Sequence, residues 1–149
     1  MGMGKTIQEI QIGDQASVAK TITETDVYLF AGISGDFNPM HCNEEYAKVT
    51  PFMTRIAHGA LAMSLMAPVL GQKLPGLGTI AVETSSRFLA PVFFGDTIRC
   101  VGEVTGKDED KNLVYMKFTW TNQNKVVIAT GTAVAMPPLE RFRDKIKDL

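Results

Sequence analysis

Residues 34–43, SGDFNPMHCN, place three polar side chains within six positions: Asp36, Asn38 and His41. Pro39 has a fixed φ and biases Asn38 toward an extended conformation, so the segment is predicted to form a stiff turn. Such a turn can fold the Asp36 carboxylate and the His41 imidazole toward each other. Two such groups sharing one water can add water to, or remove it from, a polarised double bond by general acid–base catalysis. Asn38 is expected to hydrogen-bond neighbouring backbone and hold the loop in shape.

Two other interpretations of these residues stay open. The segment could be an Asx-type turn with a capping aspartate and a surface histidine. It could also be part of a metal site, but Asp36, Asn38 and His41 offer too few certain ligands. No H-x-x-x-H or C-x-x-C spacing adds to them, so we predict no metal.

A second candidate stretch is AHGAL, residues 57–61. Gly59 lies near the start of an apolar segment predicted to be a helix, where backbone N–H groups lack partners within the helix. Such an N–H suits a developing oxyanion, and a glycine lets a ligand come close. The alternative is that Gly59 only permits tight packing. For His58 we expect a buried histidine with satisfied hydrogen bonds.

Composition and charge exclude several classes of protein. The formal net charge of the 149 residues is −1, which gives no electrostatic basis for binding nucleic acid or an anionic membrane. The two cysteines, Cys42 and Cys100, form no C-x-x-C and are expected to be free thiols in a reducing compartment. The first ten residues lack the apolar segment of a signal peptide, and the apolar run at 60–71 is too short to span a bilayer. We therefore expect a cytoplasmic protein.

The elements that must position these residues follow from hydrophobic periodicity. A strand is predicted at 16–22, and Thr23 with Asp26 resembles a capping box that starts a helix at 24–33. Asn43 is a predicted N-cap for a second short helix. Residues 56–71 are apolar almost all round, which predicts a buried helix.

From residue 79 the period changes to two, and four strands with short connections predict an antiparallel meander. In LVYMKFTWT, the alternation places Val114, Met116, Phe118 and Trp120 on one face. The charged tail at 137–149 is expected to be a peripheral helix. One buried helix and one long sheet combine most simply when the sheet curls around the helix, which is an α+β fold in a single domain covering 1–149. The exposed edge or face of such a sheet makes self-association expected.

Four segments together resemble the MaoC-like family, and in particular the (R)-specific enoyl-CoA hydratases. They are FAGISGDFNPMH, AHGALAMSL, LPGLGT and SSRFLAPVFFGDTI. The resemblance covers about residues 10–136, and D-x-N-P-x-H is a specific motif. It implies a hot-dog fold, in which an antiparallel sheet wraps a long helix, usually as a homodimer.

The resemblance also implies an activity, the reversible syn hydration of a trans-2-enoyl-CoA to an (R)-3-hydroxyacyl-CoA. Asp36 and His41 match the catalytic pair, Asn38 matches the supporting asparagine, and Gly59 matches the glycine whose N–H binds the thioester carbonyl. No cofactor is implied, since CoA is part of the substrate.

One departure and several alternatives remain. Some close relatives carry a serine late in the central helix where this chain has Ala67, and Ser64 lies one turn earlier. The preferred acyl length is therefore not transferred, and CoA and acyl-carrier protein both stay open as the acyl handle. A thioesterase, a hydratase for branched or dicarboxylic acyl groups bound through Arg55 or Arg87, and a non-catalytic acyl-CoA or acyl-carrier binder are the competing hypotheses.

Overall fold

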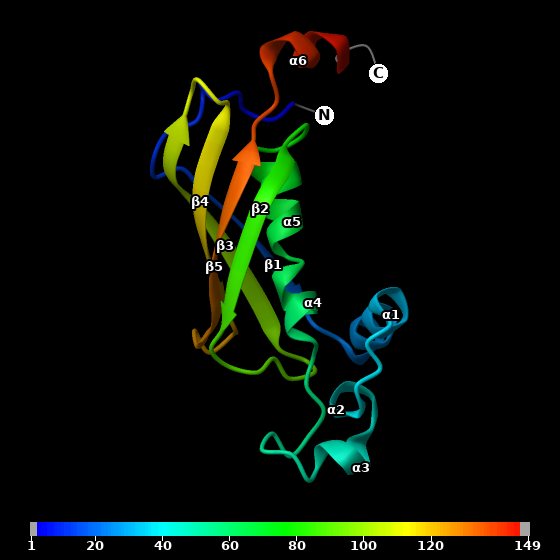
Figure 1. Cartoon of the computed structure of the whole chain (residues 1–149). Helices are drawn as coiled ribbons and strands as arrows, with labels where there is room; N and C mark the ends of the chain where they lie inside the picture. The colour runs from blue at the N-terminus through cyan, green and yellow to red at the C-terminus, as the bar shows by residue number, and fades with distance from the viewer. Residues whose placement is uncertain (1–2, 147–149) are drawn as a thin grey trace.

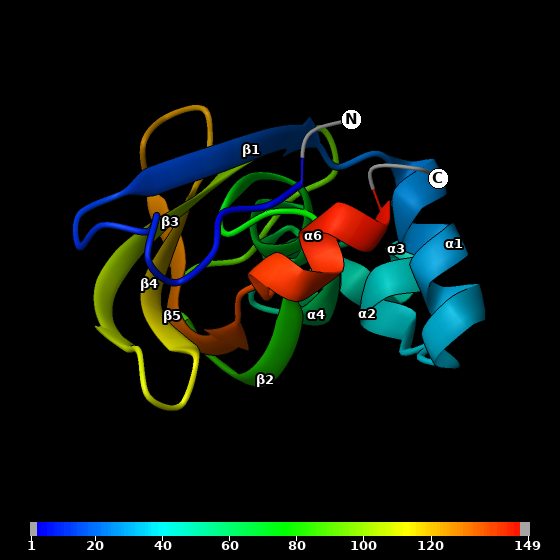
Figure 2. The same ribbon diagram turned by 90° about the horizontal axis from the view of Figure 1, so that it is seen from above.

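The computed structural model describes residues 3–146 and shows an antiparallel sheet wrapped around a helical rod (Figures 1 and 2). The strands are β1 (Gln15–Thr21), β2 (Ile80–Phe88), β3 (Thr97–Asp108), β4 (Leu113–Thr121) and β5 (Val127–Met136). The helices are α1 (Glu24–Ser34), α2 (Pro39–Cys42), α3 (Glu44–Ala47), α4 (Gly59–Met63), α5 (Met66–Pro68), the π-helical turn η1 (Val69–Lys73) and α6 (Glu140–Ile146). The arrangement confirms the predicted α+β class.

The strand order is β1-β3-β4-β5-β2, and every neighbouring pair is antiparallel. The predicted four-strand meander is therefore wrong for β2, which pairs with β5 instead of with β3. The connection at 89–96 carries the chain from the β2 edge back to the other side of the sheet. Strand pattern alone indicates which residues form strands, but β2 finds its partner across the finished sheet. Only β3, β4 and β5 form the meander.

The core lies between the inner face of the sheet and the helical rod. Val114, Met116, Phe118 and Trp120 are all at most 1% exposed, so the predicted inward face of β4 is confirmed. The rod contributes a second apolar surface, formed by Leu61, Ala62, Leu65, Met66, Val69 and Leu70. Burying this apolar area is the main favourable term in the fold.

The two cysteines are free, as expected, and differ in environment. Cys100 belongs to this core, and burial raises the pKa of its thiol to about 12. A thiol in this state is not a nucleophile at neutral pH, because only the thiolate reacts. Cys42 is partly exposed beside the site described below.

The central rod begins later than predicted and is not one regular helix. It starts at Gly59 and continues through α4, α5 and η1, which follow one another along the sheet (Figure 1). Pro68 has no N–H to donate to the Ser64 carbonyl, which accepts the Ala67 N–H at 3.0 Å instead. The local change of hydrogen bonding around this proline accounts for the division of the rod.

A small helical layer extends beyond one end of the sheet and carries the polar segment 34–43 (Figures 1 and 2). The predicted capping box starts its first helix: the Thr23 N–H donates to Asp26 at 2.8 Å, and the Asp26 N–H donates to Thr23 Oγ1 at 3.1 Å. The bond from the Thr23 N–H and the nearby Lys20 hold the pKa of Asp26 below its usual value. Asn43 likewise caps α3, because its Oδ1 accepts the Tyr46 N–H at 3.1 Å.

The C-terminal segment forms the expected peripheral helix, α6, on the outside of the fold. Arg143 on α6 pairs with Glu9 at 2.8 Å and fastens the helix to the N-terminal segment. The predicted helical tail extended to residue 149, and residues 147–149 lie outside the described part of the chain. Among residues 3–146, no helix is both long and apolar enough to cross a bilayer.

Candidate active site

The polar loop begins where α1 stops. Gly35 adopts a left-handed conformation (φ 78°), and its N–H closes the helix on the Ala31 carbonyl at 2.8 Å. Asp36 Oδ1 then accepts the Asn38 N–H at 3.0 Å, and Asn38 Oδ1 accepts the Met40 N–H at 3.1 Å. The Asx-type turn considered as an alternative therefore exists. It uses only one oxygen of Asp36, so the other remains available for chemistry.

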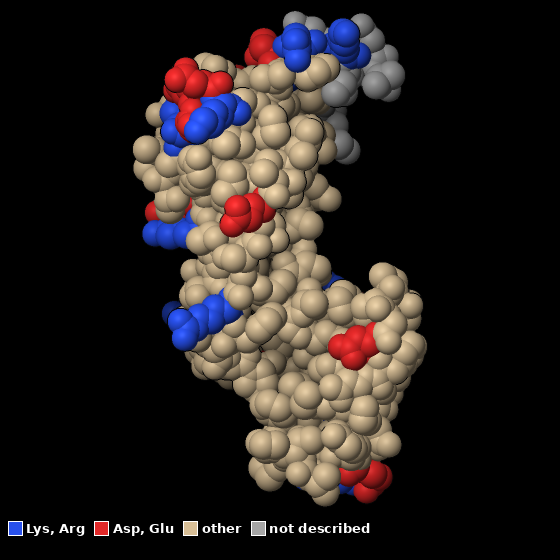
Figure 3. Space-filling view, in the orientation of Figure 1, with Lys and Arg blue, Asp and Glu red and all other residues tan. Residues whose placement is uncertain are grey.

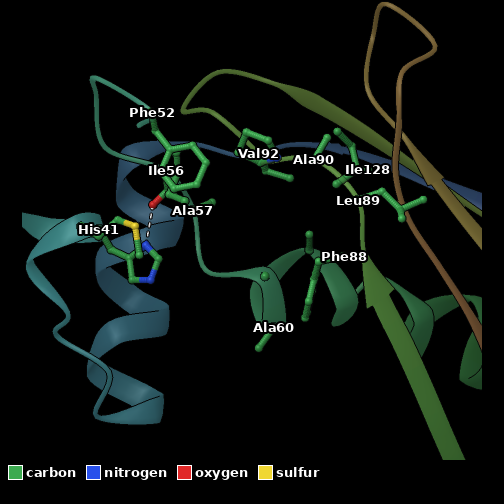
Figure 4. Close-up of a pocket in the computed structure, with 14 residues that line it drawn as sticks. His41, Phe52, Ile56, Ala57, Ala60, Phe88, Leu89, Ala90, Val92 and Ile128 are labelled. Atoms are coloured by element: carbon green, nitrogen blue, oxygen red, sulfur yellow. Dashed lines mark hydrogen bonds between the residues drawn. The ribbon is translucent and has the colours of Figure 1, made fainter. Parts of the chain in front are cut away.

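His41 is the third residue of α2 and is 7% exposed. Its Nδ1 lies 2.7 Å from the Ile56 carbonyl oxygen, drawn as the dashed line in Figure 4. A carbonyl oxygen only accepts, so Nδ1 carries the proton and Nε2 presents a lone pair. This Nε2 lies 3.9 Å from Asp36 Oδ2. Two acceptors at this separation do not bond to each other, but one water can donate a hydrogen bond to each.

His58 packs directly against this pair. Its ring centroid is 3.9 Å from that of His41, with an interplanar angle of 31°. Its Nε2 lies 2.9 Å from the Asp36 carbonyl oxygen, while its buried Nδ1 has no partner within residues 3–146. The expectation of a satisfied buried histidine is thus met at one nitrogen only. The adjacency of His58 and Gly59 in AHG was the one sequence signal that could have placed His58 at the site.

Gly59 is the first residue of α4, behind an N-cap residue whose side chain makes no capping bond. No hydrogen bond from its N–H is formed within the described part of the chain. A methyl group added to Gly59 would come within 2.5 Å of Phe88 Cε1, because the Phe88 ring lies against the glycine. Any larger residue here would have to displace this ring, which the sequence did not reveal.

A cavity of about 540 Å³ opens beside His41 and Gly59 (Figure 4). Its other walls are almost entirely apolar and come from the loop before α4, the start of α4, the end of β2 and the loop that follows. They are formed by Met40, Phe52, Ile56, Ala57, Ala60, Ala62, Phe88, Leu89, Ala90, Pro91, Val92 and Ile128. Asp36 and Asn38 do not line this cavity. Half of the Asp36 side chain is exposed (51%).

Neither arginine considered for a second substrate carboxylate lines the cavity. Arg55 donates to Glu24 at 2.6 Å and to Glu44 at 2.9 Å, and its guanidinium lies 4.8 Å from the centre of the Phe94 ring. Hydrogen bonds to these carboxylates raise the pKa of Arg55. The bond between Arg55 and Glu44 also lowers the pKa of Glu44. Arg55 therefore joins α1 to α3 through these two carboxylates.

Arg87 precedes Phe88 on β2. Successive side chains of a strand point to opposite faces, so Arg87 points away from the cavity that Phe88 lines.

Some relatives carry a serine where this chain has Ala67, and the structure shows where Ala67 and Ser64 lie. Ala67 is exposed, and Ser64 donates its hydroxyl to the Leu61 carbonyl of its own helix at 2.6 Å. Neither residue lines the cavity. Ser64 therefore does not replace a serine at position 67.

Asp36, His41 and His58 form a group with one possible ligand atom each, all within 4.8 Å of one another. The sequence alone indicated Asp36 and His41 as possible ligands, but not His58. Hydrogen bonding argues against a metal, because His58 Nε2 is engaged with the Asp36 carbonyl, and the two rings pack against each other at an angle of 31°. A metal ligand needs its lone pair directed at the ion. The metal-free site remains our prediction.

Comparison with known proteins places the chain in a family. Residues 7–126 match the MaoC like domain family. The chain is 50% identical over 131 residues to an (R)-specific enoyl-CoA hydratase of Rhodospirillum rubrum, covering 88% of this chain and 90% of that protein. It is 37% identical to an (R)-specific enoyl-CoA hydratase of Aeromonas caviae, covering 88% of this chain and 98% of that protein.

Solved structures of related hydratases have the same fold as this chain. The unliganded R-hydratase PhaJ1 from Pseudomonas aeruginosa superimposes with a TM-score of 0.87 at 37% identity, covering 93% of this chain and 89% of that one. The (R)-hydratase from A. caviae gives 0.85 at 37% identity, covering 88% and 99%. The fold is the predicted hot-dog fold, and the match over residues 7–126 shows that this chain belongs to the MaoC-like domain family.

Proposed function

We propose that this protein is an (R)-specific enoyl-CoA hydratase, a hydro-lyase that adds water reversibly to trans-2-enoyl-CoA. The observation that carries the proposal is the pair of free acceptors, Asp36 Oδ2 and His41 Nε2, which lie 3.9 Å apart, with His41 lining an apolar cavity. The two relatives at 50% and 37% identity, both (R)-specific enoyl-CoA hydratases, support the same reaction.

The chemistry follows from the two acceptors and the Gly59 N–H. The thioester carbonyl binds at Gly59, whose N–H stabilises the negative charge that develops on the oxygen. Water held between Asp36 and His41 attacks C3 while Asp36 takes its proton. The proton then reaches C2 on the same face, through the same pair, so that H and OH add syn. Asn38 keeps the loop in place through its bond to Met40. No group beyond these side chains and the acyl-CoA is invoked.

The cavity walls point to the acyl group. His41 is the only titratable side chain among the lining residues. Two arginines adjoin lining residues in the sequence: Arg55 is engaged by Glu24 and Glu44, and Arg87 points away from the cavity. An ionised carboxylate in such a cavity would be desolvated without a partner, which is costly. We therefore propose neutral hydrocarbon acyl chains as substrates, in preference to dicarboxylic ones.

The test of the function is the loss of enoyl-thioester absorbance with crotonyl-CoA, followed by determination of product chirality. Hydration to the (R)-alcohol is expected. An enoyl-CoA with a terminal carboxylate is expected to react poorly, and release of free thiol would indicate a thioesterase. Tight binding of acyl-CoA without turnover of any of these compounds would favour the non-catalytic binder.

Gly59→Ala is expected to lower kcat/KM by up to ~10²-fold, because the methyl displaces the Phe88 ring and with it the bound thioester. The added Phe88→Leu change removes the ring atoms that clash. We therefore expect the double variant to recover much of the lost kcat/KM in the same assay. Full activity of Gly59→Ala alone would contradict the importance of this contact.

We also propose that two chains pair through β2. All nine residues of this edge strand are exposed, including Ile80, Val82 and Phe88. A long, exposed edge strand is a template for pairing with another chain. Figure 3 shows that few charged side chains interrupt the face over which β2 runs. A two-fold symmetric partner would cover this strand with the same strand of its own.

Sedimentation of the wild-type protein is expected to give twice the chain mass of 16.3 kDa. Val82→Glu places two carboxylates near each other in such a dimer and is expected to yield a monomer. Ile12→Glu is the matched control, since Ile12 is exposed (67%) but lies outside β2. A wild-type monomer, or equal effects of the two variants, would contradict the pairing.

A further inference from the structure

His58 is a buried titratable residue that the proposed reaction does not use. Only 2% of its surface is exposed, and it does not line the cavity. Its ring lies between those of Phe30 and His41, with centroid distances of 5.0 Å and 3.9 Å. It therefore contacts the reacting histidine without direct access to an acyl group.

The hydrogen bond of His58 determines which nitrogen carries its proton. Nε2 lies 2.9 Å from the Asp36 carbonyl oxygen, which can only accept, so Nε2 donates. Nδ1 is left as a bare, buried acceptor without a partner in residues 3–146. His41 has the opposite arrangement, because its Nδ1 donates to Ile56. The two stacked imidazoles are thus held as opposite tautomers.

Resting on the function proposed above, we propose that His58 is the positioning residue of this site. Its Nε2–H holds the main chain of Asp36, whose carboxylate Oδ2 lies 4.0 Å from the same nitrogen and 3.9 Å from His41 Nε2. The Asp36 side chain is half exposed, so its direction depends on such backbone contacts. The His58 ring also supports one face of His41. Through these two contacts His58 fixes the separation of the groups that share water.

Two amide variants of different length test where the N–H must lie. Glutamine can place an amide N–H near the position of Nε2, whereas asparagine reaches only the position of Nδ1. His58→Gln is expected to keep most of the wild-type kcat for crotonyl-CoA, and His58→Asn is expected to lose up to ~10²-fold, the scale of a small misplacement. KM is expected to stay near the wild-type value in both, because His58 does not line the cavity.

Equal kcat in the two variants, or a loss confined to KM, would overturn the positioning role. Thermal unfolding of both variants provides the control for stability. A structural role alone would not produce rescue by glutamine with an unchanged KM.

A second measurement is independent of substrate. The chain has only two histidines, so long-range ¹H–¹⁵N spectra contain the signals of two imidazole rings. The set of signals that disappears in His58→Gln belongs to His58. At pH 8, where imidazoles are ordinarily neutral, we expect an Nε2–H signal for His58 and an Nδ1–H signal for His41. An Nδ1–H tautomer at His58 would overturn the contact with Asp36. If the wild-type protein hydrated no enoyl-CoA, the proposed function would fall, and the tautomers would still decide this contact.

Discussion

The Asp36→Asn variant is expected to fold normally and to hydrate crotonyl-CoA at least ~10²-fold more slowly than the wild-type protein. Asparagine keeps a side-chain oxygen that can accept the Asn38 N–H, so the turn is retained. It replaces the acceptor that faces His41 by an amide that cannot take a proton from water. The loss should appear in kcat, measured by the decrease in enoyl-thioester absorbance.

The matched control is Asp36→Ala, which removes both carboxylate oxygens. It should lose the same activity and also lower the melting temperature, because the Asn38 N–H loses its acceptor. Wild-type activity in Asp36→Asn would end the assignment of Asp36 as the base. Loss of folding in Asp36→Asn would mean that the turn, and not the chemistry, depends on the charge.

His41→Asn is expected to lose activity on the same scale, at least ~10²-fold in kcat, without loss of the α2 structure. Asparagine can place an amide N–H near the position of Nδ1 and keep the bond to the Ile56 carbonyl, which is 2.7 Å long in the wild-type protein. It has nothing at the position of Nε2, which faces Asp36. The variant therefore separates the buried hydrogen bond from the acceptor that shares the water.

His41→Gln is the complementary control, since its amide reaches the region of Nε2 but leaves the Ile56 carbonyl without its donor. It should be less stable than His41→Asn in thermal unfolding. The double variant Asp36→Asn/His41→Asn tests whether the two side chains act on one water. Groups that act as a unit lose little more together than apart. Fully multiplicative losses would indicate two separate roles.

Local signals were enough to predict much of this fold. Thr23 and Asp26 form the capping box they indicated, and Asn43 caps α3, because both interactions span only three residues. The period-two pattern placed Phe118 and Trp120 in the core. The pairing of β2 was predicted wrongly, since antiparallel strands of similar pattern do not specify their neighbours.

In the candidate site, too, neighbours in the sequence were predictable and contacts between distant segments were not. The short spacing of Asp36 and His41 made their proximity predictable, and the structure places their reactive atoms 3.9 Å apart. His58 comes from a segment 22 residues beyond Asp36, so only the folded chain brings its ring onto His41. Arg55 was considered for substrate because a cation is a natural partner of a carboxylate. Its two partners, Glu24 and Glu44, lie on helices whose relative placement is a tertiary property.

The pairing of β2 with β5 has a consequence for the order of events during synthesis on the ribosome. Ile80 pairs with Met136 and Phe88 with Ala129, so β2 is translated before β3, β4 and its own partner, β5. The apolar rod is also translated before four of the five strands that enclose it, β2 to β5. Long-range pairing of this kind is slow and leaves apolar segments open to aggregation. The nascent chain should therefore expose apolar surface until its last strand is translated.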